Sequence, residues 1–184
     1  MTTLYVVLGV AAVIILWVIG TFNKLVSLVN RGKEAWADID VQLKRRYDLI
    51  PNLVETVKGY AAHEKSVFEE VTKARSAAMQ ADGAAEQGAA ENMLSGALKS
   101  LFAVSEAYPD LKANENFLNL QNELTDTENK IQAARRFYNT VVRDLNTALE
   151  VFPTNMIAGI LGFSPREFFE LEEEAAKDPV KVSI

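Results

Sequence analysis

The sequence has no cysteine and a single histidine among its 184 residues. Without cysteine the chain has no disulfide, no thiolate nucleophile and no thiol that could carry a lipid anchor. Its histidine, His63, lacks the second histidine of the His-Glu-x-x-His zinc motif, and one imidazole cannot supply the paired Glu-x-x-His ligands of a di-iron bundle. Neither the phosphate loop of nucleotidases nor the Gly-x-Ser-x-Gly nucleophile elbow occurs. These absences predict a non-enzymatic protein that needs no metal or cofactor.

Positive charge is also scarce. The chain has 19 lysines and arginines against 25 acidic residues, which gives a formal net charge of −6. A protein that binds nucleic acid needs a basic face, and no basic stretch interleaved with aromatic residues is present to stack bases. We therefore expect no nucleic-acid partner.

One long stretch lacks charge and proline altogether. Residues 4–22 read LYVVLGVAAVIILWVIGTF, and as a helix they would span roughly 28 Å, enough for the hydrocarbon core of a bilayer. The preceding MTT has no basic residue and the run is longer than that of a signal peptide. Residues 1–23 are therefore predicted to be a permanent transmembrane anchor in the lipid bilayer. Lys24, Arg31 and Lys33 follow the run, so the positive-inside rule predicts a cytoplasmic C-terminal domain.

After this run, mostly apolar residues recur every seven positions in two columns, which predicts a helix with a coiled-coil-like seam. One column is Leu25, Gly32, Ile39, Arg46, Leu53, Tyr60, Val67 and Ala74, and the other is Val29, Trp36, Leu43, Ile50, Val57, Glu64, Val71 and Ala78. If continuous, the helix from residue 23 to residue 78 would be roughly 80 Å long. Arg46 and Glu64 are its polar exceptions. A buried cation needs a partner, so we hypothesise that these two residues set the register of the bundle.

Pro51 interrupts this pattern, because a proline inside a helix removes one backbone hydrogen bond and clashes with the carbonyl four residues earlier. The heptad keeps its phase across Pro51, which favours a kinked but continuous helix. The alternative is a true break, with Asp48 capping a new helix.

Two more helical segments follow, over residues 86–107 and 117–152, the second with a clean seven-residue repeat that ends at Phe-Pro-Thr-Asn. No stretch alternates with period two. The sequence thus predicts an all-α protein: an antiparallel, elongated bundle with coiled-coil-like packing over residues 24–163, attached to the anchor. In residues 164–184, a capping box formed by Ser164, Pro165 and Glu167 would begin a short acidic helix before a disordered tail.

Two surfaces are candidates for contacts. Around the consecutive cations, the candidate partner surface comprises Lys44, Arg45, Asp48, Pro51 and His63. Arg45 would lie roughly 35 Å above the bilayer, beyond the reach of its surface potential, so pairing with Glu123, Asp126 or Glu128 is favoured over lipid contact. The second surface is the apolar stretch NMIAGILGF, with Met156, Ile157, Ile160, Leu161 and Phe163. It is either core at the end of the bundle or a contact with membrane or a neighbouring protein.

Three long stretches resemble the LemA family: AWADIDVQLKRRYDLIPNLVETVKGYAAHE, then ENMLSGALKSLFAVSEAYPDLKANENFLNLQNELTDTENKIQAARRFYNTVVRDLN, and finally FPTNMIAGILGF. The resemblance implies a bacterial single-pass protein of the inner membrane with an antiparallel four-helix bundle. It implies no established biochemical activity. It also implies membrane-associated roles, since one family member is associated with building magnetosome membranes and others accompany membrane proteases and envelope-stress systems.

Two hypotheses follow. In the first, the protein is a scaffold that forms homo-oligomers and organises membrane or membrane-protein assemblies. In the second, it is an adaptor or regulatory binding module that presents the surface around residues 47–63 to a membrane protease or sensor. The anchor, the heptad body and the missing active site favour the scaffold.

Overall fold

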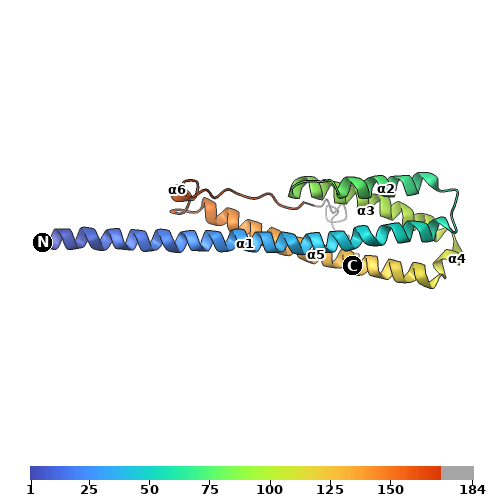
Figure 1. Cartoon of the computed structure of the whole chain (residues 1–184), viewed down its shortest axis with the longest axis horizontal. Helices are drawn as coiled ribbons and strands as arrows, with labels where there is room; N and C mark the ends of the chain where they lie inside the picture. The colour runs from blue at the N-terminus through green and yellow to red at the C-terminus, as the bar shows by residue number, and fades with distance from the viewer. Residues whose placement is uncertain (171–184) are drawn as a thin grey trace, which may run out of the picture. The chain divides into compact units, whose positions relative to one another are not determined.

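A computed structural model of the protein describes residues 1–170, which contain helices and no strand. The helices are α1 (Thr2–Lys58), α2 (Lys65–Ala78), α3 (Ala84–Glu106), α4 (Pro109–Lys112), α5 (Glu115–Glu150) and α6 (Asn155–Ala158), as Figure 1 shows. The predicted all-α class is confirmed. The long helix α5 begins where the side chain of Asn114 accepts a hydrogen bond from the backbone of Phe117 (3.0 Å) and ends just before Pro153, as its sequence predicts.

The helix α1 continues through Pro51, which confirms the prediction that the helix does not end there. Because proline has no N–H, the carbonyl of Tyr47 loses its helical donor. The side chain of Arg75 replaces it, with its Nε donating to that carbonyl at 2.8 Å. A hydrogen bond from another helix thus offsets part of the penalty of the proline, and Pro51 itself faces solvent.

A single helix up to Ala78 does not form, because α1 ends at Lys58 and the chain turns over Gly59–Glu64. Glycine favours helix ends, and the amides of Tyr60 and Ala61 both bond to the carbonyl of Val57. Tyr60, a predicted seam residue, is exposed in this turn. The turn lets α2 return and pack against α3, and apolar residues of α2 such as Phe68 and Val71 are buried.

The chain divides into two compact units. Unit 1 contains residues 1–40 and 133–166, and unit 2 contains residues 41–132 together with residues 167–170. Both α1 and α5 contribute to each unit. Unit 2 is an antiparallel bundle, in which successive helices run in opposite directions (Figure 1). Its helices are the end of α1, then α2 and α3, and the start of α5. Its core includes Ile50, Leu53, Leu94, Leu101 and Phe117.

Unit 1 pairs the beginning of α1 with the end of α5. The rings of Trp36 and Tyr138 meet edge to face at 5.2 Å between centroids, and a small core contains Leu25, Leu28, Leu145 and Ala158. The apolar stretch near the N-terminus is helical and its side chains are exposed, and by length and composition it is able to cross a membrane.

The segment after the turn at Gly162 corrects the predicted capping box, because residues 164–170 do not form a helix. The side chain of Asn146 instead holds the backbone of Arg166 in two hydrogen bonds, each 2.9 Å long. Further along, Phe169 is completely buried and the backbone of Glu170 lies against Gly88 of α3. An extended chain satisfies these contacts where a helix would not. The rest of the predicted acidic helix and tail lies outside the described residues.

Candidate functional site

The most distinctive group of side chains in unit 2 surrounds Arg46, which is only 2% exposed. Its Nη1 donates to Glu91 Oε2 at 2.6 Å and its Nη2 to Ser95 Oγ at 2.9 Å, both on α3. Glu128 of α5 lies 2.8 Å from Arg46 Nε, an ion pair without the alignment of a hydrogen bond. The expectation that a buried cation on this seam has an acidic partner is therefore met.

Glu91, the principal partner, is itself completely buried. Its second oxygen accepts hydrogen bonds from the Tyr47 hydroxyl and from Gln87 Nε2, the latter at 2.9 Å. Gln87 also donates to the carbonyl of Ala78 at 3.1 Å. Residues 87, 91 and 95 are spaced by four, so α3 presents them on one face towards α1. We call Arg46, Tyr47, Gln87, Glu91 and Ser95 the buried polar network.

The surroundings of the network shift the pKa values of Tyr47 and of the adjacent Glu128. Burial raises the pKa of Tyr47 far above its usual range, and the neighbouring Glu91 carboxylate raises it further. Tyr47 therefore stays protonated and donates to Glu91. Burial also raises the pKa of Glu128, although the Arg46 guanidinium opposes this effect. A tyrosine that retains its proton and a carboxylate already saturated with donors are suited to holding helices together, and poorly suited to proton transfer.

Sequence reasoning missed Glu91, Gln87 and Ser95. The available signal was their spacing: three polar residues recur every fourth position beside the apolar face that carries Leu94 and Leu98. Such a polar stripe next to a core face indicates side chains that need buried partners.

Glu64 was the other predicted register residue, and the structure does not bring it to Arg46. It immediately precedes α2, where it is half-buried, outside the network. The heptad phase that placed it on the seam of Arg46 ends with α1 at Lys58.

The predicted partner surface is exposed or half-buried and carries several ion pairs. Lys44 pairs with Asp48 on its own helix at 3.0 Å. Arg45 reaches Asp126 at 3.4 Å and Glu123 at 3.9 Å on α5, as predicted for this cation. Exposed pairs of this kind contribute little to stability. Pro51 and His63 are exposed as well, although they lie at different places along the chain: Pro51 is within α1 and His63 is in the turn before α2.

The apolar stretch after α5 contains both buried and exposed residues. Ala158 is buried, whereas Ile157, Leu161 and Phe163 are half-buried. The ring of Phe163 contacts that of Phe22 of α1 edge to face, with 5.7 Å between centroids. Met156 and Ile160 are 65% and 85% exposed, and Phe152, which sequence reasoning did not single out, is 78% exposed. One side of this stretch therefore packs on unit 1 and the other stays open.

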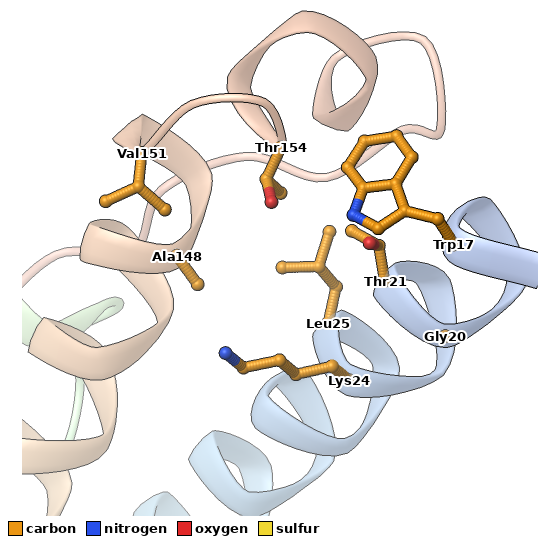
Figure 2. A pocket seen from close by; sticks show the side chains of 8 residues that line it. All are labelled: Trp17, Gly20, Thr21, Lys24, Leu25, Ala148, Val151 and Thr154. Atoms are coloured by element: carbon orange, nitrogen blue, oxygen red, sulfur yellow. The ribbon is translucent and has the colours of Figure 1, made fainter. Parts of the chain in front are cut away.

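A cavity of about 360 Å³ lies beside this stretch, also within unit 1. Trp17, Thr21 and Lys24 of α1 line one side, and Val151 and Thr154 line the other (Figure 2). No group of three histidine, aspartate or glutamate residues within residues 1–170 is placed to hold a metal ion.

A family model described as the LemA family matches residues 35–184. The chain belongs to the LemA family. The matched region contains the entire buried polar network, whereas Trp17, Thr21 and Lys24 precede it. The LemA family resemblance seen in the sequence is thereby confirmed.

Two curated relatives illustrate the range of the LemA family. The magnetosome protein MamQ of Magnetospirillum gryphiswaldense is 24% identical over 185 residues, which cover 86% of this chain and 68% of the relative. The protein LemA of Metamycoplasma hominis is 28% identical over 159 residues, which cover 84% of this chain and 71% of the relative. Neither name is that of an enzyme.

Proposed function

We propose that this LemA-family protein is a membrane-anchored, non-enzymatic helical scaffold that self-associates and organises bacterial membrane or membrane-protein assemblies. The observation that carries the proposal is the composition of α1. One uninterrupted helix contains both an exposed apolar stretch long enough to cross a bilayer and, further along, the buried Arg46 of unit 2. The same helix thus contains the apolar stretch and residues of the helical domain.

The chemistry of the buried polar network supports a structural role. Arg46 and Glu91 form an ion pair, Ser95 accepts from the second guanidinium nitrogen Nη2, and Tyr47 and Gln87 donate to the second carboxylate oxygen. The third guanidinium nitrogen, Nε, lies beside Glu128. Polar contacts between helices specify one register among several that apolar packing alone would allow. A scaffold needs such a defined shape more than it needs a reactive group.

Self-association has separate support. Large apolar side chains stay exposed beyond the apolar stretch, among them Val41 and Phe137, and a second copy could cover them. The magnetosome proteins among the relatives support a role in a cellular assembly. The excess of positive charge after the anchor supports an inner-membrane protein with its helical domain in the cytoplasm.

The deciding experiment is the mass of the full-length protein in mild detergent, measured by light scattering with correction for bound detergent. A uniform oligomer at several protein concentrations is the expected result. A strict monomer that remains folded by circular dichroism would refute the scaffold.

The alternative is an adaptor or regulatory binding module for a membrane protease or envelope-stress system. It is favoured by the exposure of Lys44, Asp48, Pro51 and His63. Under this alternative, crosslinking in cells yields a stable complex with another protein. Arg45→Glu then abolishes that complex. Its melting temperature stays close to that of the wild type, because an exposed ion pair contributes little to the free energy of unfolding.

A further inference from the structure

The cavity of unit 1 presents several hydrogen-bond donors without protein partners. Lys24 extends its amino group towards α5, and the indole nitrogen of Trp17 faces the side of Thr154 (Figure 2). Within residues 1–170, the Lys24 ammonium, the Trp17 indole N–H and the hydroxyls of Thr21 and Thr154 have no side-chain hydrogen bond or ion pair. Lys24 is exposed and Trp17 is 36% exposed, so these donors are open to a ligand with several acceptor atoms.

The lining also indicates the charge of that ligand. Lys24 supplies a positive charge to the lining, and among residues 1–170 no acidic side chain lines the cavity. Leu25 and Val151 supply apolar wall. A ligand with a net negative charge and an adjoining apolar portion fits this lining, whereas the ammonium of a zwitterionic headgroup would have no carboxylate to contact.

The position along α1 identifies where such a ligand would come from. Trp17 lies in the last part of the apolar stretch of residues 4–22, and Lys24 lies just beyond its end. Tryptophan and lysine at these places are typical of the membrane–water interface, which contains the lipid phosphates. The contact between Phe22 and Phe163 fixes the stretch after α5 at the same level of α1. Phe152, Met156 and Ile160 are exposed there and can enter the apolar side of the interface.

We propose that this cavity binds the phosphodiester headgroup of an anionic phospholipid. The Lys24 ammonium pairs with the phosphate, the threonine hydroxyls and the Trp17 indole N–H donate to its oxygens, and Leu25 and Val151 contact the glycerol and upper acyl carbons. The proposal rests on the membrane anchor of the proposed function and is independent of self-association.

The test uses the full-length protein in nanodiscs that contain equal amounts of phosphatidylglycerol and phosphatidylcholine. After release from the nanodiscs, native mass spectrometry counts the lipids that each chain retains. Lys24→Gln is compared with Lys33→Gln, a matched control that removes an exposed lysine of the same helix outside the cavity. A cation near the membrane surface contributes enough to expect about a fivefold loss of retained phosphatidylglycerol in Lys24→Gln.

Wild type and Lys33→Gln are expected to retain phosphatidylglycerol in preference to phosphatidylcholine, and free inorganic phosphate in millimolar excess is expected not to displace it. Equal losses in the two variants, or retention without preference between the lipids, would overturn the site. Displacement by free phosphate would overturn its assignment to lipid. A chain that never enters nanodiscs would instead refute the membrane anchor, so the two failures are distinguishable.

Discussion

The substitution Glu91→Leu tests the buried polar network directly. Leucine fills most of the volume of glutamate, so the change removes charge and acceptors without opening a large cavity. Arg46, which is 2% exposed, would keep Ser95 and the ion pair with Glu128 but lose its 2.6 Å hydrogen bond to Glu91. The Tyr47 hydroxyl would still accept a hydrogen bond from Gln87 Nε2 at 3.0 Å, but its remaining acceptor would be the carbonyl of Ala78 at the longer distance of 3.4 Å.

The expected magnitude follows from these remaining contacts. Removal of one partner of a buried ion pair costs about 3–5 kcal/mol, because the other charge is left buried. Since Glu128 still compensates Arg46 in part, we expect the lower end, a loss of about 3 kcal/mol in the free energy of unfolding. For a chain of this size this lowers the melting temperature by about 6–12 °C.

The assay is urea unfolding of the full-length protein in mild detergent, followed by circular dichroism. Glu123→Leu is the control, because it makes the same change at an exposed acid within the helix α5, and it should change stability by less than about 0.5 kcal/mol. The double variant Arg46→Met with Glu91→Leu should recover most of the loss, because no unpaired charge remains in the pair. A Glu91→Leu loss below about 1 kcal/mol, or a double variant as unstable as the single one, would refute the reasoning.

Three further predictions concern register, pH and close packing. Arg46→Leu should lower the melting temperature and alter the oligomer mass, and if neither changes, Arg46 does not set the register. Burial raises the pKa of Glu128 above its ordinary 4.5, so its protonation favours the folded state. This stabilisation is full below pH 4.5 and is lost as the pH rises through the raised pKa. Glu128→Gln should therefore weaken the dependence of the urea midpoint on pH between about pH 4 and pH 8. If the midpoint of the variant depends on pH as strongly as that of the wild type, the raised pKa does not belong to Glu128. A Cβ at Gly88 would lie 2.2 Å from the carbonyl oxygen of Glu170, so Gly88→Ala should lower the free energy of unfolding by roughly 1–3 kcal/mol as the segment around Phe169 shifts. Gly96 lies on the same helix with open space where a Cβ would lie, so Gly96→Ala should raise the free energy of unfolding by up to about 1 kcal/mol. If the urea midpoints of the two variants move in the same direction, the close contact at Gly88 is not what limits that position.

Local patterns in the sequence were enough for the fold class and for several residue environments. The apolar stretch of residues 4–22 and the seven-residue repeats predicted helices, because both depend on neighbours within a few turns. The same periodicity placed Arg46 on the buried side of α1, and the preference of α1 to continue across Pro51 followed from the unbroken phase. Pairing of the consecutive cations with acids on another helix was also expected, and Arg45 pairs with Glu123 and Asp126.

Tertiary structure decided what depends on residues far apart in the chain. Glu91 became the partner of Arg46 although 45 positions separate them, because the return of the chain after Lys58 brings α3 against α1. The same turn removed Glu64 from the predicted seam. Residues 164–170 stayed extended because Asn146 holds the backbone of Arg166 and the core accepts Phe169. The local sequence determines which segments favour a helix. The burial of charges and rings against distant helices determines where a helix ends and which side chains meet.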